Sequence, residues 1–181
     1  MMKKVLVVVD MQNDFVDGAL GSEYAAGIVP EAVKKIREYA EDPGTLIYAT
    51  MDTHGNDYLQ TAEGRKLAVP HCVKGTEGRE LNQEIAKALP ERTVIVEKPA
   101  FGSTALAAFL QGEALKKGGA DLDIAMLGLC TDICVVSNAL ILKAALPEAR
   151  VSVFQYCCAG TTPEKHLAAL EVMRSCQVNI E

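Results

Sequence analysis

The sequence predicts a three-layer α/β fold, in which a largely parallel sheet of six strands carries helices on both faces. Six short apolar runs, most of them rich in β-branched residues, are spaced along the chain at 5–9, 45–50, 93–96, 123–129, 151–154 and 178–180. Continuous apolar runs of this kind are typical of strands that are buried on both faces. Helical patterns separate the runs, and this β-α-β alternation implies right-handed crossovers and a parallel sheet.

Five segments between these runs have the apolar spacing of helices: 29–39, 81–89, 103–117, 131–145 and 163–176. Ser103 or Thr104 is the expected N-cap of the third helix, and Thr131 is the expected N-cap of the fourth. Pro163 falls in the first turn of the last helix, where proline is favoured. His166 lies in the amphipathic pattern of the same helix and is expected at its surface.

Composition and charge weigh against several functional classes. A net charge of −6 disfavours a nucleic-acid-binding surface, which needs clustered lysine and arginine. No apolar run reaches the length of a membrane span, and the first run is too short for a signal peptide and ends at Asp10, so we expect a cytoplasmic protein. Its six cysteines should then be reduced thiols, and none shows C-x-x-C spacing. The length, with no repeat or linker, suits one domain over residues 1–181.

Reactive side chains follow the predicted strands at their carboxyl ends. Asp10 follows the first strand, Lys98 follows the third, and Cys134 lies just past the fourth. The second strand runs into Asp52 and His54. Ligands of open parallel sheets bind in the crevice at the carboxyl ends of the strands. We therefore expect an acid, an amine, a thiol and a pair of metal-ligand candidates to face each other there.

Cys134 is the candidate nucleophile. It falls in the first turn of the predicted helix 131–145, where the helix dipole and free N–H groups lower the pKa of a thiol. The same N–H groups can bind the oxyanion of a tetrahedral intermediate. A buried structural cysteine is the commoner role of a single cysteine. The neighbouring strand ends, which carry Asp10 and Lys98, favour the catalytic role instead.

Asp10 and Lys98 each have a simpler explanation when they are considered alone. An aspartate at a strand end commonly caps a turn, and a lysine there is commonly solvated. Beside a thiol, the Lys98 ammonium favours the thiolate, and beside Asp10 it holds that carboxylate in place. A carboxylate whose pKa is raised by burial can serve as the proton acceptor in place of a histidine.

A long polar loop over residues 52–80 interrupts the alternation and predicts a metal site. Loops of this length in compact domains are usually functional. Four side chains of the loop offer oxygen or imidazole ligands: Asp52, His54, Glu63 and His71. The mixture suits a divalent metal, with zinc expected and iron(II) or manganese as alternatives. A hydrogen-bonded Asp–His pair without metal is the simpler alternative.

Most of these candidates lie in four segments, which read VVVDMQNDF, DTH…EG…PHCVKGTEG, EKPAFGSTAL and LGLCTDICV. Together, the segments resemble the motifs of the isochorismatase-like cysteine hydrolase superfamily, in the same order and over nearly the whole chain. The metal-loop segment is similar to that of the nicotinamidase/pyrazinamidase branch. The resemblance implies the three-layer α/β fold and the hydrolysis of nicotinamide to nicotinate and ammonia through a cysteine thioester.

The resemblance also implies roles for individual residues. Asp10, Lys98 and Cys134 would form a catalytic triad. A cis peptide at Leu129–Cys130 would allow the backbone N–H groups of Cys130 and Cys134 to form the oxyanion hole. The geometry of this peptide cannot be inferred from composition or spacing.

For the loop, the resemblance implies a metal ion held by Asp52, His54 and His71, with Glu63 as a fourth ligand in some members. The metal binds the pyridine nitrogen in this branch and so fixes the ring. Many nicotinamidases also carry an aromatic residue shortly before the last metal histidine. Here residues 67–70 are LAVP, and the chain has no tryptophan. The candidates for packing against the substrate ring are then Phe15, Phe101 and Tyr58.

The expected partner is thus a small amide substrate, while the sequence leaves open whether the chain forms a homo-oligomer. A related hydrolase of another small amide or of a vinyl ether remains an alternative, although the vinyl-ether enzymes lack the metal loop. A peptidase-like Cys–His dyad would use His54 or His71 as the base. A non-catalytic flavodoxin-like binding module would need a glycine-rich phosphate loop after the first strand, where this chain has DMQNDFVDG.

Overall fold

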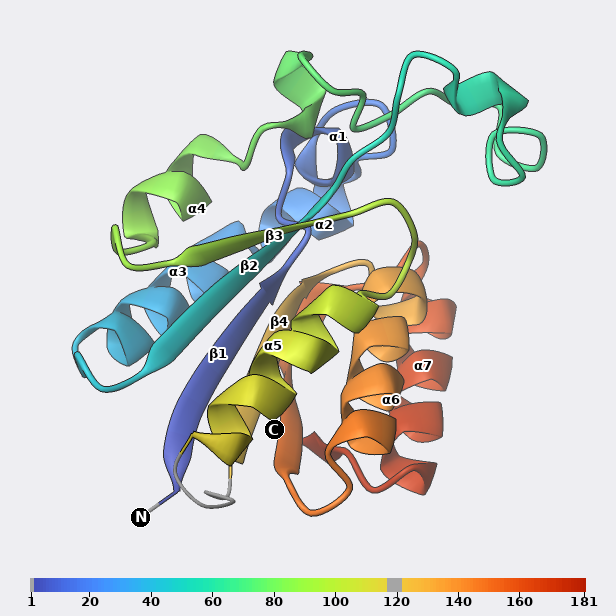
Figure 1. Cartoon of the computed structure of the whole chain (residues 1–181). Helices are drawn as coiled ribbons and strands as arrows, with labels where there is room; N and C mark the ends of the chain where they lie inside the picture. Colours follow the sequence, from blue (N-terminus) through green and yellow to red (C-terminus); the bar gives the residue numbers. More distant parts are fainter. Residues whose placement is uncertain (1, 117–121) are drawn as a thin grey trace.

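The computed structural model describes residues 2–116 and 122–181, which form a six-stranded sheet with helices on both faces (Figure 1). The strands are β1 (Lys3–Val9), β2 (Leu46–Asp52), β3 (Val94–Lys98), β4 (Leu122–Leu129), β5 (Arg150–Ala159) and β6 (Asn179–Ile180). Their order is β3-β2-β1-β4-β5-β6, and every neighbouring pair is parallel. The predicted fold class is confirmed.

Seven α-helices and one π-helical turn connect the described strands. They are α1 (Asn13–Val16), α2 (Glu23–Gly27), α3 (Val29–Ala40), α4 (Gln83–Ala88), α5 (Thr104–Leu115), the turn η3 (Thr131–Val135), α6 (Val136–Ala145) and α7 (Pro163–Ser175). Helices α3 and α4 pack together on one face, and α5, α6 and α7 lie side by side on the other (Figure 1). The chain therefore reverses its direction of winding between β1 and β4, and ligands bind at such a switch point.

Strands β1 and β4 approach each other closely at their carboxyl ends. Val9 of β1 pairs with Gly128 of β4, whose φ is +129°. A Cβ atom at Gly128 would lie 2.1 Å from the carbonyl oxygen of Val9, so only glycine fits this contact and this conformation. Asp10 leaves the sheet directly after Val9, and the segment that carries Cys134 leaves it just after Gly128. The close approach thus brings the two reactive segments to one crevice.

The core consists of the apolar residues of the inner strands and of the helix faces packed on them. Val5 to Val9 of β1 are all fully buried, as are Ile124, Met126 and Leu127 of β4. Both faces of the central strands are covered, which explains why these runs are continuously apolar instead of alternating. The free energy of burial that holds the sheet together also fixes the positions of the strand ends.

Helix boundaries differ from the predictions in several places. The expected helix 81–89 is shorter, because Asn82 caps α4 and its side chain accepts a hydrogen bond from the Glu84 N–H. Ser103 caps α5 as expected, whereas Lys117, the predicted end of that helix, lies outside the described residues. The short helices α1 and α2 were not predicted, because four- and five-residue segments carry too little periodicity to be recognised.

Two expectations near the fourth strand are wrong. Thr131 is not a helix cap: Cys130 precedes the turn η3, and no side chain caps it. The Thr131 hydroxyl instead contacts the imidazole of His166 at 2.8 Å. His166 is accordingly buried and not on the surface, with 7% of its area exposed. In the described part of the chain, no helix has the length and apolar character required to cross a membrane.

Candidate active site and metal centre

The carboxyl ends of four strands bring the predicted site residues together. Asp10 follows β1, Asp52 ends β2, Lys98 ends β3, and Cys134 lies in the turn η3 after β4. Thr50 of β2 fixes Asp10, because its hydroxyl donates to Asp10 Oδ1 at 2.6 Å and its carbonyl accepts the Asp10 N–H at 3.2 Å. Asp10 is held in the left-handed region, with φ at 47°, a conformation that aspartate tolerates better than most residues.

Lys98 is the centre of the site. Its Nζ lies 2.7 Å from Asp10 Oδ2, 3.5 Å from Asp52 Oδ1 and 3.6 Å from Cys134 Sγ. It also donates to the carbonyl oxygen of Ala100 at 3.0 Å. The Lys98 side chain is 1% exposed and that of Asp10 is 0% exposed, so the ion pair is fully withdrawn from water. One ammonium thus joins the candidate base, the candidate nucleophile and a candidate metal ligand.

Burial sets the protonation of these groups. Burial alone would lower the pKa of Lys98, but the nearby carboxylates, Asp10 first and Asp52 after it, outweigh burial and raise the pKa, so Lys98 remains an ammonium. Burial also raises the pKa of Asp10, and the Lys98 charge opposes this shift. The pKa of Cys134 lies well above its ordinary value because the thiol is buried and because it faces Asp10.

The expectation that the helix start lowers the pKa of Cys134 is therefore wrong. Desolvation of the thiolate and the facing Asp10 carboxylate raise the pKa of Cys134 by more than the Lys98 charge lowers it. The resting side chain is a neutral thiol, and it can become a nucleophile only if a neighbouring group takes its proton. The Asp10 carboxylate contacts the same Lys98 ammonium as the thiol does. Its raised pKa makes it suited to accept the thiol proton.

The turn around Cys134 is held by the buried side chain of Asn138. Its Nδ2 donates to the carbonyl oxygen of Cys134 at 2.8 Å and to that of Phe101 at 3.3 Å. Its Oδ1 accepts the Ser103 N–H at 2.9 Å. Asn138 thereby connects the turn η3, which contains Cys134, to the segment that follows β3. The peptide bond at Leu129–Cys130 is cis, as the resemblance implies, and it enters the same turn.

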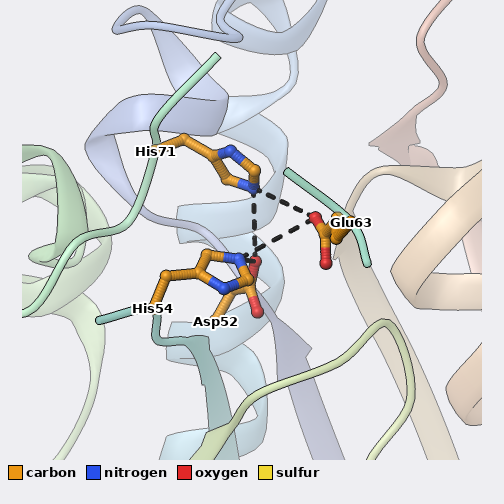
Figure 2. A group of neighbouring side chains, drawn as sticks. All are labelled: Asp52, His54, Glu63 and His71. Atoms are coloured by element: carbon orange, nitrogen blue, oxygen red, sulfur yellow. Dashed lines mark hydrogen bonds and ion pairs between the residues drawn. The ribbon is translucent and has the colours of Figure 1, made fainter. Parts of the chain in front are cut away.

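Asp52 at the end of β2 and three side chains of the following loop, His54, Glu63 and His71, form a compact cluster of potential metal ligands. Figure 2 shows them pointing toward one another. His54 Nε2 lies 3.0 Å from Asp52 Oδ2 and 3.8 Å from Glu63 Oε1. His71 Nε2 lies 3.5 Å and 3.6 Å from the same two oxygens. All four ligand atoms lie within 4.8 Å of one another.

These distances fit a tetrahedral metal ion. Metal–ligand bonds of about 2.1 Å place tetrahedral ligand atoms roughly 3.4 Å apart, which the observed distances bracket. His71 Nδ1 lies 2.9 Å from the carbonyl oxygen of Val69, a contact that directs Nε2 toward the cluster in the manner of metal-binding histidines. The adjoining buried or half-buried groups include three carboxylates and one ammonium. With neutral imidazoles, two negative charges remain, and a divalent cation would balance them.

Gln12 is a supporting residue that is not evident from the sequence. Its side-chain amide donates to the carbonyl oxygen of Asp52 at 2.8 Å, and its carbonyl oxygen accepts the Asp52 N–H at 2.7 Å. It also donates to the Arg79 carbonyl oxygen at 2.7 Å, which closes the end of the long loop onto the site. The only sequence signal for this role is its place two residues after Asp10. Asn138 has no such signal.

A cavity of about 520 Å³ lies beside the cluster. It is lined by His54, Thr61, Ala62, Glu63, Lys66, Leu67, Pro99, Ala100, Phe101 and Ile133. His54 and Glu63 connect it to the metal ligands, and Ile133 directly precedes Cys134. A volume of this size falls within the usual range for small-molecule sites. The cavity therefore reaches both the cluster of metal-ligand candidates and the turn η3 that contains Cys134.

The three candidate aromatic residues occupy different positions. Phe101 lines the cavity and is 47% exposed. Phe15 is buried and meets His71 edge-on, with ring centroids 5.5 Å apart. Tyr58 is also buried, and its ring lies 4.8 Å from that of His54 and 5.0 Å from that of His71. Phe101 is thus the one of the three in the cavity lining, whereas Tyr58 packs against the metal-ligand candidates.

Comparison with known proteins decides the family. The sequence profile described as the isochorismatase domain matches residues 4–180. The chain belongs to the isochorismatase family. As a member of this family, it is a hydrolase, and its sheet and helices match those of solved relatives.

Three relatives of this isochorismatase-family chain are informative. The nicotinamidase/pyrazinamidase of Mycobacterium tuberculosis is 25% identical, over 98% of this chain and 97% of its own. A pyrazinamidase of Pyrococcus horikoshii, solved in complex with zinc, is 30% identical with a TM-score of 0.80, over 99% of this chain and 98% of its own. The N-carbamoylsarcosine amidase of Thermoplasma acidophilum is 27% identical with a TM-score of 0.76, over 99% and 96%. The relatives therefore differ in substrate.

The cluster predicts that one divalent metal ion binds per chain and that His54→Ala loses it. The substitution removes one imidazole ligand, and the loop lies outside the sheet core, so the fold should persist. Elemental analysis of the purified protein measures zinc, iron and manganese. His166→Ala is the matched control, because it removes the one histidine outside the cluster and should retain the metal. Equal metal content in both variants would contradict the assignment.

Proposed function

We propose that this isochorismatase-family protein hydrolyses nicotinamide to nicotinate and ammonia through a thioester on Cys134. One observation carries the proposal: a single buried ammonium, that of Lys98, lies within 3.6 Å of the Cys134 sulfur and within 2.7 Å of the Asp10 carboxylate. Such a group balances the charge changes of a proton transfer between the two. A cavity that extends from His54 and Glu63 of the metal-ligand cluster to Ile133, the residue before Cys134, supports a substrate held at both ends.

In the first half of the reaction, Asp10 takes the proton of the Cys134 thiol, and the sulfur attacks the carboxamide carbon. The carbon–sulfur bond forms, and the carbonyl oxygen becomes an oxyanion, which the N–H groups of Cys130 and Cys134 stabilise. Asp10 then gives its proton to the nitrogen as the carbon–nitrogen bond breaks, so that ammonia leaves. Lys98 keeps its charge throughout, and it lowers the pKa of the buried Asp10 carboxyl, which favours the ionised form that accepts the thiol proton.

In the second half, Asp10 takes a proton from water, whose oxygen attacks the thioester carbon. The carbon–sulfur bond breaks, and Asp10 returns its proton to the Cys134 sulfur. The second proton of the water leaves with the product as nicotinic acid, which ionises to nicotinate in solution. The raised pKa of Asp10 suits this exchange, because it makes the carboxylate a stronger proton acceptor than an ordinary aspartate. Histidine has no role in these steps.

The metal-ligand candidates would orient the substrate. Asp52, His54, Glu63 and His71 would hold a divalent ion, for which we propose zinc, and the bound ion supplies a Lewis acid that takes the ring nitrogen. Phe101 would pack against the pyridine ring of the substrate. Phe15 would hold His71 in place through their edge-on ring contact. With these assignments, the substrate binds with its ring nitrogen at the metal-ligand end of the cavity and its carboxamide at the Cys134 end. We propose further that the protein acts in the cytoplasm, in the salvage of nicotinamide for NAD.

Another small amide is the second candidate substrate, and a specific observation favours it. Residues 67–70 place no aromatic side chain before His71, and Leu67 lines the cavity instead. The similarity to an N-carbamoylsarcosine amidase supports amides other than ring carboxamides. The vinyl-ether alternative is disfavoured by the four-ligand cluster, and the Cys–His dyad is disfavoured because His54 and His71 face two carboxylates of that cluster.

We expect Cys134→Ala to abolish turnover, because the variant lacks the thiol that contacts Lys98. Cys157→Ala and Cys176→Ala are the controls and should keep most of the activity, since neither thiol lies near the triad. Ammonia release from nicotinamide is the measurement. Activity of Cys134→Ala equal to that of the wild type would refute the thioester mechanism.

The pH profile should report Asp10. As the base, it must be ionised, so kcat/KM is lost as the pH falls through its pKa, which burial raises above the ordinary value of 3.8. The hydrogen bond from the Thr50 hydroxyl lowers this pKa, and Thr50→Val should therefore move the acid limb to higher pH. Thr50→Ser keeps the hydroxyl and should leave the limb in place. A limb that is unchanged in Thr50→Val would argue against Asp10 as the base.

Substrate choice tests the metal-bound ring nitrogen. Benzamide has the shape of nicotinamide without that nitrogen, and a site built around a polar contact rejects such an analogue by about 10⁴-fold in favourable cases. We expect kcat/KM to fall in the order nicotinamide, pyrazinamide, benzamide at equal metal loading, with pyrazinamide accepted. Equal turnover of benzamide and nicotinamide would instead indicate a broader amidase of the same family.

A further inference from the structure

His166 is a buried histidine that the proposed mechanism does not use. It lies one turn into α7, far along the chain from the metal ligands, and only 7% of it is exposed. Its Nδ1 lies 2.8 Å from the hydroxyl of Thr131, which is itself fully buried. The ring of Tyr24 meets the imidazole edge-on at 6.0 Å. A polar pair withdrawn from water in this way indicates a specific structural task.

The partner of His166 belongs to the nucleophile turn. Thr131 directly follows Cys130 and is the first residue of η3, which contains Cys134. Both N–H groups of the proposed oxyanion hole therefore lie within three residues of the Thr131 hydroxyl. Capping by a threonine side chain requires the position just before the first turn, which Cys130 occupies here. Here that hydroxyl is bonded to α7 instead, so the turn is positioned from outside.

A second set of contacts holds α7 against the same turn. The Asp132 carboxylate accepts the Thr161 N–H at 2.8 Å and the Thr161 hydroxyl at 2.7 Å. Glycine at position 160 allows this close packing. A Cβ atom there would lie 2.8 Å from the backbone nitrogen of His166 and 2.9 Å from Asp132 Oδ1. The start of α7 thus fits closely over η3, with one buried and one exposed polar attachment.

We propose that His166 is a positioning residue of the hydrolase: its hydrogen bond to Thr131 holds the η3 turn so that the N–H groups of Cys130 and Cys134 point at the oxyanion. The inference rests on the proposed function, because it assigns the oxyanion to this turn. Burial lowers the pKa of His166, so the imidazole is neutral and shares one hydrogen bond with the hydroxyl. A misplacement of about 1 Å in such donors can lower the rate by about 10²-fold, because the donors stabilise the charge that develops in the transition state and not the uncharged ground state.

The test separates transition-state from ground-state affinity. Pyridine-3-carbaldehyde is the probe: the Cys134 sulfur adds to its carbonyl carbon, the thiol proton passes to Asp10, and the oxygen becomes an oxyanion in the proposed hole. Nicotinate, which forms no such adduct, is the ground-state probe. We expect His166→Ala and Thr131→Val to lower kcat and aldehyde affinity by about tenfold or more. KM and the affinity for nicotinate should change by less than about threefold.

Conservative variants provide the rescue. Thr131→Ser keeps the hydroxyl, and His166→Asn places a polar atom near the position of Nδ1, so both should recover most of the lost kcat. The double variant with His166→Ala and Thr131→Val should be no worse than the poorer single variant, because the two residues act through one bond. Leu170→Ala, at a buried apolar position on the same helix, is the control for lost stability alone. It should lower the unfolding temperature without separating the two affinities.

Each outcome bears on a different claim. If His166→Ala and Thr131→Val behave like Leu170→Ala, with kcat and aldehyde affinity retained, the positioning role is wrong while the proposed function stands. A wild-type enzyme that releases no ammonia from nicotinamide and forms no aldehyde adduct at Cys134 would overturn the proposed function, and the inference with it. Parallel loss of kcat and aldehyde affinity, restored by Thr131→Ser, supports both.

Discussion

The buried ion pair between Lys98 and Asp10 is the interaction on which the rest of the site depends. Withdrawing a carboxylate and an ammonium from water costs several kcal/mol per ion, and only close opposite charges and hydrogen bonds offset this. Lys98 is paired at 2.7 Å with Asp10 and lies 3.5 Å from Asp52, so its charge is shared between the triad and the metal-ligand cluster. Removing either partner would leave an isolated charge in the interior. The two halves of the site are therefore one electrostatic unit.

The fold makes this unit possible because a reversal in winding brings the ends of β1 and β4 side by side. The contact of Gly128 with Val9 closes the gap between them, and β2 and β3 add Asp52 and Lys98 from the same edge. Asp10, Asp52 and Cys134 then lie on or just after largely buried strands, and Lys98 is itself buried at the end of the edge strand β3. Hydrogen bonds then restrain the site residues: Gln12 holds Asp52, Thr50 holds Asp10, and Asn138 holds the backbone of Cys134. A rigid scaffold of this kind holds a neutral thiol beside its base without exposing either to water.

Much of the fold and of the candidate site is evident from the sequence, for a physical reason. Strands buried on both faces must be continuously apolar, and the polar residues where they end must meet in a parallel sheet, which predicts the meeting of Asp10, Lys98 and Cys134. What local patterns could not predict depends on tertiary burial. The Thr131 hydroxyl does not cap a helix because it bonds to His166 of α7, which is 35 residues away in the sequence. His166 is buried because α7 packs on the turn η3. The raised pKa of the Cys134 thiol likewise follows from desolvation and not from its place at a helix start.

An acyl-enzyme on Cys134 is the central claim of this account, and product partitioning tests it most directly. Hydroxylamine added during turnover competes with water for the thioester and yields the hydroxamate in place of nicotinate. The measurement is the ratio of hydroxamate to nicotinate, with nicotinamide and methyl nicotinate as alternative substrates. Both substrates would form the same thioester, so the account predicts the same ratio from each at equal hydroxylamine concentration. Ratios that depend on the leaving group would contradict a common thioester and would require direct attack of water on the substrate.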